Sequence, residues 1–211
     1  LVGLLPASHR HAIGLHPTPE WMARRVVTWL GDEPAAGMLD PACGTGVFLL
    51  AWLRAAAERE GTSVQVTGVE TSPLIAAAAR VAAERAATAV GGTTQATVHE
   101  ADLLCDLRVS PDAPPQLRAA DGLHPLPPVP LVLGNPPWVA WDRLPAGYKA
   151  KLAPGPLAAL DAFDRHGFEA QLGAANDDVS ALFAQIALAH LVAPRGRLVF
   201  LAMPPVATGP G

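Results

Sequence analysis

Residues Asn135, Pro136, Pro137 and Trp138 are the stretch of the sequence best suited to chemistry. They follow a short apolar run, Leu131 to Leu133, which proline and glycine bound as in a central strand of a parallel sheet. In open α/β sheets, ligands bind at the carboxyl ends of such strands. An asparagine oxygen and a backbone carbonyl can accept both hydrogens of an amine, while a tryptophan ring stacks on a base. The stretch therefore predicts a binding site for the exocyclic amine of a planar base. The alternative is a proline-rich turn that binds no ligand.

A glycine-rich turn is the second candidate site, and its sequence is Asp40-Pro-Ala42-Cys43-Gly44-Thr-Gly46. Glycines at such a turn let a ligand approach the backbone closely. The third glycine of a dinucleotide fingerprint is absent, and no Gly-Lys-Ser/Thr follows, which excludes a phosphate-binding P-loop. The carboxylate of Asp40 would repel a pyrophosphate but attract an ammonium group. These features favour S-adenosylmethionine, which has adenosine at one end and a cationic amino-acid group at the other.

Two further acids end the next two expected strands. Glu70 lies 24 residues after Gly46, close to the offset of about 20 residues at which an acid accepts hydrogen bonds from ribose hydroxyls. Asp102 ends the third expected strand and could accept from an adenine amino group. A single acid at the end of a strand is more often a solvated side chain than a ligand-binding residue. Three of them on successive strands, beside the glycine turn, favour a cofactor site.

Alternating strands and helices must position these residues. Thr18 as N-cap and Pro19 at the first position predict a leading helix over residues 19–30. Further helices are expected over 47–60, 73–90 and from 178 or 180 to about 192, with strands over 37–40, 64–70, 96–102, 131–133 and 197–203. This order predicts one α/β domain over residues 1–211, with a Rossmann-like parallel sheet of five strands and helices on both faces. Residues 103–128 are expected to form a proline-rich loop, with one short helical turn near 116–120, and residues 138–178 a long active-site loop.

The composition narrows the class of protein. The 211 residues are 50% hydrophobic and carry a net charge of −4, whereas self-sufficient DNA-binding modules are usually basic. Cys43 and Cys105 fit reduced thiols, and neither they nor the three histidines before residue 17 have metal-ligand spacing, so no metal is expected. No apolar run is long enough to cross a membrane and no signal peptide is recognisable, so a cytoplasmic location is expected.

In combination, these motifs resemble the catalytic domain of DNA adenine-N6 methyltransferases whose leading cofactor helix comes first. The similarity covers nearly all of residues 10–208 and extends to large single-chain restriction–modification and phage-defence methylases. It implies that Asn135, Pro136, Pro137 and Trp138 form the catalytic motif. It also implies that S-adenosylmethionine is bound by a set spread over the chain: Thr18, Pro19, Asp40, Ala42, Cys43, Gly44, Gly46, Glu70, Asp102 and Asn135.

Three other interpretations remain open at this point. A similar Asn-Pro-Pro-aromatic motif serves enzymes that methylate a protein glutamine or ribosomal RNA, and a cytosine-N4 amine poses the same chemical problem as adenine N6. A non-catalytic methyltransferase-fold fragment is also consistent with the sequence. The resemblance further implies C-terminal antiparallel strands and a target-recognition domain that this chain lacks, so contact with DNA is expected through a domain outside it. The recognition sequence and the oligomeric state do not follow from the residues.

Overall fold

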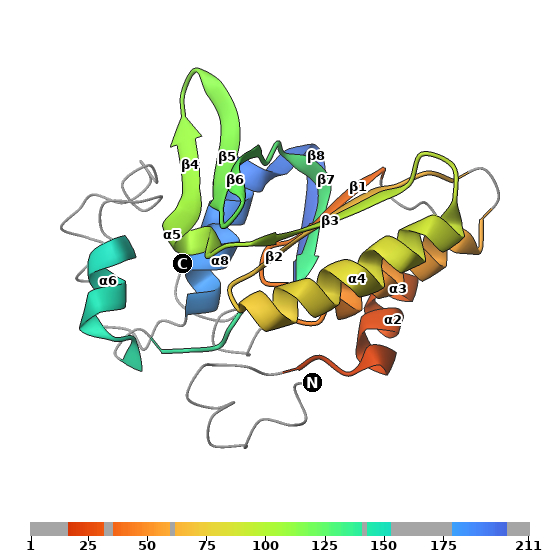
Figure 1. Ribbon diagram of the computed structural model, residues 1–211, viewed down its shortest axis with the longest axis horizontal. Helices are drawn as coiled ribbons and strands as arrows, with labels where there is room; N and C mark the ends of the chain where they lie inside the picture. The colour runs from red at the N-terminus through yellow and green to blue at the C-terminus, as the bar shows by residue number, and fades with distance from the viewer. Residues whose placement is uncertain (1–16, 32–35, 60–61, 141–142, 153–178, 202–211) are drawn as a thin grey trace.

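Figure 1 shows the computed structural model of the protein, which describes residues 17–31, 36–59, 62–140, 143–152 and 179–201. The centre of the molecule is a five-stranded sheet in the order β3-β2-β1-β7-β8, and every neighbouring pair in it is parallel. Its strands are β1 (Gly37–Asp40), β2 (Gln65–Glu70), β3 (Gln95–Glu100), β7 (Val129–Gly134) and β8 (Val192–Phe200). The predicted α/β class and the five parallel strands are therefore confirmed.

Helices cover both faces of this sheet, as predicted. One face packs against α2 (Glu20–Trp29), α3 (Val47–Ala57) and α4 (Pro73–Val90). Phe48 and Trp52 of α3 are almost fully buried in this layer, beside Met38 of β1 and Leu131 of β7. The core on this side is therefore built by the apolar faces of α2 to α4 closing over the strand side chains that alternate toward them.

The opposite face carries a second core. It is covered by α5 (Leu103–Asp106), α8 (Val179–Ile186) and the π-helical turn η4 (Ala187–Leu191). Leu39, Val69 and Val132, from β1, β2 and β7, point into this layer, whereas their strand neighbours point into the first. The continuous apolar run of β7, Leu131 to Leu133, follows from this burial on both faces.

Residues 107–125 form a second sheet, which corrects the loop expected over 103–128. Its three antiparallel strands are β4 (Leu107–Ser110), β5 (Ala113–Ala119) and β6 (Gly122–Pro125), in the order β4-β5-β6. The helical turn expected near 116–120 lies inside β5, so that prediction is wrong as well. Leu117 is fully buried against the second core, which supplies the tertiary packing that lets a proline-rich segment form strands. The β4–β5 hairpin projects beyond the main sheet (Figure 1).

The remaining elements match the predictions with local differences. The helix α4 has the predicted bounds, and α2 and α3 are shorter at their ends than expected. The Pro194-Arg-Gly196 segment forms an irregularity within β8, with Arg195 at φ 65°, so β8 begins before the expected start at residue 197. The expected long loop contains α6 (Ala146–Leu152), and its residues 153–178 lie outside the described part of the chain. Among the described helices, none is both long and apolar enough to span a bilayer.

Candidate cofactor and substrate site

The predicted site residues follow strands that end at one edge of the main sheet. Asp40 ends β1, Glu70 ends β2, Asp102 lies two residues after β3, and Asn135 follows β7. The strand order runs outward from β1 in one direction and from β7 in the other, so the boundary between β1 and β7 is where the topology reverses. Ligands of open α/β sheets bind at such a switch point. Asp40 and Asn135 come from the two strands that flank it.

Asp40 is packed directly against the strand end that precedes Asn135. A Cβ atom on Gly134 would lie 2.6 Å from the Asp40 Oδ1 atom, so glycine is what permits this approach. The same Oδ1 atom accepts a hydrogen bond of 3.1 Å from the backbone N–H of Ala42. Asp40 is only 1% exposed. Burial raises its pKa to about 7, the Ala42 hydrogen bond opposes that rise, and the negative charge of Glu70 adds to it.

Glu70 organises the glycine turn between β1 and α3. Its Oε2 atom accepts from the N–H of Gly44 at 3.0 Å, and its Oε1 atom accepts from the N–H of Ser72 at 2.8 Å. Gly44 and Gly46 have φ values of 53° and 80°, which glycine adopts without strain. The carboxylate of Glu70 therefore joins the turn after β1 to the start of α4. Ligand contact by Glu70 would use the remaining lone pairs of these oxygens.

Cys43 is a packing residue inside the same turn. Its N–H donates to the Val69 carbonyl at 2.8 Å, and its side chain is buried against Gly68 of β2. Burial raises the pKa of the Cys43 thiol well above its usual value, and the negative charges of Asp40 and Glu70 raise it further. The group therefore stays a thiol near neutral pH and is unsuited to nucleophilic attack.

Replacing Gly68 by alanine is expected to destabilise the fold by about 1–3 kcal/mol, because the added methyl group overpacks the turn. Its Cβ would lie 2.8 Å from Cys43 Sγ and 2.9 Å from Leu49 Cδ1. Denaturant unfolding monitored by circular dichroism measures the change. The matched control is Gly147→Ala on α6, where nothing lies within 4 Å of the new atom and a slight stabilisation is expected. Equal stabilities of the two variants would contradict the close packing at Gly68.

Asn135 is linked to the leading segment of the chain by a hydrogen bond. Its Nδ2 atom donates to the Thr18 Oγ1 atom at 3.0 Å, across 117 positions of sequence. This contact corrects the prediction that Thr18 caps the leading helix, because the N-cap of α2 is Pro19 and no side chain caps that end. The donor end of the Asn135 amide is thereby fixed on Thr18, which sets the direction of its carbonyl end, Oδ1.

The rest of the Asn-Pro-Pro-Trp segment is held by packing. Pro136 is buried, whereas Pro137 and Trp138 are half-buried. The indole Nε1 of Trp138 donates to the carbonyl of Leu201 at 3.3 Å. Leu201 follows β8, so the tryptophan fastens the segment after β7 to the end of the neighbouring strand.

Asp102 is the N-cap of α5. Its Oδ1 atom accepts from the N–H groups of Leu104 and Cys105, at 3.0 and 3.3 Å. The N–H of Ala101 donates to the Glu70 carbonyl at 3.0 Å, which keeps the start of this turn beside the end of β2. The cap gives the carboxylate a structural role in addition to the cofactor contact that the sequence predicts.

Tyr148 of α6 is a neighbour of Asp102 that the sequence analysis did not identify as a site residue. Burial raises the pKa of Tyr148, and the charge of Asp102 and a hydrogen bond to it raise it further. Burial and the charge of Asp102 likewise raise the pKa of Cys105 to about 11. Both groups therefore stay protonated at neutral pH. Tyr148 is the single tyrosine of the sequence. It lies in a region without clear periodicity, so no local pattern indicates that it contacts Asp102.

The glycine turn also brings Ala42 and Gly46 into the site. The N–H of Gly46 donates to the Cys43 carbonyl at 2.8 Å, and Gly46 then serves as the N-cap of α3. Pro19 is exposed at the start of α2, next to Thr18. The structure thus groups the predicted residues Thr18, Asp40, Ala42, Cys43, Gly44, Glu70 and Asn135 through the contacts described above, and places Asp102 beside Glu70 through the backbone.

Comparison with known proteins gives similarity at the level of structure. No protein-family profile matches the sequence, and no curated protein sequence is significantly similar to it. A protein from Listeria monocytogenes described as a class I S-adenosylmethionine-dependent methyltransferase superposes with a TM-score of 0.54 and 18% identity, over 97% of this chain and 50% of that one. This chain thus spans about half the length of that protein.

Two other solved structures are less similar. A modification subunit described as part of a type I restriction enzyme from Vibrio vulnificus gives a TM-score of 0.41 at 18% identity, over 62% of this chain and 26% of that one. The DrdV–DNA complex gives 0.41 at 18% identity, over 63% and 15%. With its parallel sheet, its covering helices and the Listeria match, the chain has the fold of the class I S-adenosylmethionine-dependent methyltransferases.

Proposed function

We propose that this chain is the catalytic core of an S-adenosylmethionine-dependent methyltransferase that methylates the N6 amine of a flipped adenine in DNA. The observation that carries the proposal is the hydrogen bond from Asn135 to Thr18, beside the Asp40 carboxylate packed on Gly134. Three sequence motifs that are far apart in the chain meet there, at the switch point between β1 and β7. In the proposed reaction, the segments that contain Thr18 and Asp40 would bind the cofactor and the segment that contains Asn135 would bind the amine.

The charges at the site fit a cationic cofactor. Asp40 and Glu70 are 1% and 9% exposed, and the charge of Glu70 acts on Asp40 to raise its pKa. Two neighbouring buried carboxylates repel each other, so an ammonium or sulfonium group between them would relieve that repulsion. A pyrophosphate would add to it. Asp40 would hold the amino-acid end of the cofactor near Thr18, Glu70 the ribose, and Asp102 the adenine amino group.

The Asn135 segment would supply the amine site. The amine of adenine is a poor nucleophile because its lone pair is delocalised into the ring. Acceptance of its two hydrogens by Asn135 Oδ1 and the Pro136 carbonyl would favour a pyramidal nitrogen whose lone pair is directed at the methyl group. When bound, S-adenosylmethionine supplies a methyl group already activated by its sulfonium, so that positioning and electrostatics provide much of the rate.

The proposed substrate class, a base flipped out of DNA, follows from how the amine must reach Asn135. An adenine stacked inside a duplex cannot present N6 to the half-buried Asn135, so the base must leave the helix. Trp138 would stack on the flipped base, a contact worth about 1–3 kcal/mol. With a net charge of −4, the chain would take most of its grip on DNA from a recognition domain outside these residues, as in a cytoplasmic restriction–modification or phage-defence enzyme.

The test is mass spectrometry of nucleosides from unmethylated duplex and single-stranded DNA, incubated with the protein and S-adenosylmethionine carrying a deuterated methyl group. Deuterated N6-methyladenine is the expected product, and Asn135→Ala is the matched negative control. Deuterated N4-methylcytosine would keep the mechanism and change the base. Label in ribosomal RNA or in a protein glutamine, offered in parallel, would replace the DNA assignment. Cofactor binding without transfer to any acceptor would contradict the proposal and favour a non-catalytic fragment.

A further inference from the structure

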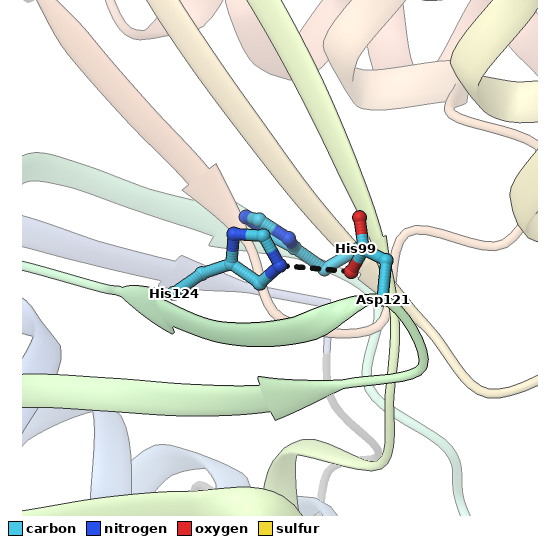
Figure 2. Close-up of side chains that lie close together, drawn as sticks. All are labelled: His99, Asp121 and His124. Carbon is cyan, nitrogen blue, oxygen red and sulfur yellow. Dashed lines mark hydrogen bonds and ion pairs between the residues drawn. The ribbon is translucent and has the colours of Figure 1, made fainter.

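We propose that His99, Asp121 and His124 form a binding site for a divalent transition-metal ion, for which Zn²⁺ is the best match. Figure 2 shows the three side chains gathered at one point, and none of them belongs to the candidate cofactor and substrate site. Within the described part of the chain, they form one group of three possible ligands whose donor atoms all lie within 4.8 Å of one another. Two imidazoles and a carboxylate are a ligand set that Zn²⁺ uses in proteins.

The fold brings these residues together from two different sheets. His99 lies on β3, the edge strand of the main sheet, and points to the face covered by the second core, opposite to Val98. Asp121 lies in the tight turn between β5 and β6, and His124 lies on β6. The N–H of Ala120 donates to the Glu100 carbonyl at 2.9 Å, which fastens this turn to β3. The ligands are thus set on backbone that hydrogen bonds already hold together.

The distances are close to those of a metal site. His124 Nε2 and Asp121 Oδ1 lie 2.8 Å apart, and the rings of His99 and His124 have centroids 4.7 Å apart at an angle of 43°. Zinc–ligand bonds of about 2.0–2.2 Å require donor atoms roughly 3.3–3.5 Å apart in a tetrahedral site. The Asp121 side chain is 68% exposed and free of tight packing, so a change of rotamer can bring the three donors to that spacing. A fourth position would remain for water.

The electrostatics favour a cation at this point. Burial lowers the pKa of His99, and the adjacent His124 ring and Arg80 lower it further, while Asp121 raises it. Metal binding requires an imidazole in its neutral form. Arg80 donates two hydrogen bonds to the Val98 carbonyl, at 3.1 and 2.9 Å. Its positive charge opposes the metal, whereas the Asp121 carboxylate, which lies in contact with His124, favours it.

A metal at this point would join the inserted β4–β5–β6 sheet to the edge of the main sheet. His99 is three residues before Asp102 and pairs in register with Val69, next to Glu70. The ion would therefore stabilise the strand end that positions two of the candidate cofactor residues. This role is independent of the proposed reaction, because it requires neither a cofactor nor an acceptor.

No local pattern of residues indicates this site. The three residues are separated by 21 and two positions, and His99 belongs to a strand that reads as part of a parallel sheet. The segment between them was expected to be a loop. The juxtaposition follows from the inserted sheet, which folds back along β3.

The experiment is titration of the metal-free protein with Zn²⁺ in competition with a chromophoric chelator, followed by Co²⁺ absorption spectroscopy. Wild-type protein is expected to bind one Zn²⁺ at this site, and a ~100-fold excess over Kd should raise the unfolding midpoint by roughly 5–10 °C. Asp121→Asn and His124→Gln change exposed or half-exposed side chains. Each should weaken Zn²⁺ binding by at least about tenfold and abolish that rise in the midpoint.

Two controls make the assignment specific. The triple variant His9→Gln/His11→Gln/His16→Gln removes the histidines before residue 17 and should bind Zn²⁺ at this site as tightly as wild type. Unfolding midpoints in the presence of chelator check that each variant is folded. Absence of Zn²⁺ binding by wild type, or wild-type affinity in Asp121→Asn and His124→Gln, would overturn the proposal. A thiolate charge-transfer band with Co²⁺ would assign the ion to a cysteine and overturn it as well.

Discussion

Asn135→Ala is expected to reduce methyl transfer to DNA by at least roughly 10²–10³-fold, a loss comparable to removal of one preorganised polar group at a transition state. The alanine cannot accept a hydrogen bond from the substrate amine, whereas Asp40 and Glu70, the proposed cofactor ligands, lie on other strands. Affinity for S-adenosylmethionine should therefore stay close to wild type. Deuterium-label transfer measures the rate, and isothermal titration calorimetry measures the affinity.

Thr18 supplies a control that separates chemistry from positioning. Thr18→Val keeps the shape of the side chain but removes the oxygen that accepts from Asn135 Nδ2. Loss of one such hydrogen bond, worth about 1 kcal/mol, should slow transfer by roughly fivefold. Thr18→Ser should restore it. If Asn135→Ala lowers cofactor affinity as much as it lowers the rate, the asparagine is structural and the proposed mechanism is wrong.

The strands and the glycine turn could be predicted because their causes are local. Apolar runs bounded by glycine or proline indicate buried parallel strands, and the positive φ values at Gly44 and Gly46 require the residue that is there. The topology then brings Asp40 and Asn135 together without further information, since parallel strands end at the same edge. The α/β fold therefore followed from the alternation of strand and helix patterns, and the candidate site from the polar residues at the strand ends.

The features that sequence reasoning missed depend on tertiary contacts. Thr18 has the residue type of an N-cap, but its hydroxyl accepts from Asn135, which is distant in sequence. The proline-rich segment forms β5 because Leu117 is buried in the second core. Tyr148 reaches Asp102 only once α6 lies over α5. None of these contacts has a local periodicity, so the sequence alone could not indicate them.

Asp40→Asn is expected to stabilise the fold at pH 8 while weakening S-adenosylmethionine binding by roughly 10–100-fold, the cost of losing a hydrogen bond to a buried charge. The folded pKa of Asp40 is about 7, above its ordinary value of 3.8. Its contribution to stability is therefore fully present below pH 4 and is lost as the pH rises through 7. Asparagine is neutral throughout and can still accept from Ala42, so the gain at pH 8 should be on the order of 2–4 kcal/mol, measured by denaturant unfolding.

The pH dependence of cofactor binding tests whether the Asp40 carboxylate contacts the cationic part of the cofactor. A cationic ligand lowers the pKa of a neighbouring carboxyl, so binding to wild type releases the proton that Asp40 holds below pH 7. Affinity should consequently fall by about tenfold between pH 8 and pH 6. The amino group of the ligand itself titrates near this range, and Asp40→Asn isolates that part because it has no carboxyl to protonate. If Asp40→Asn keeps the wild-type pH profile of binding, Asp40 is not the group that contacts the cation. If Asp40→Asn gains stability but binds the cofactor as tightly as wild type, Asp40 is not part of the cofactor site.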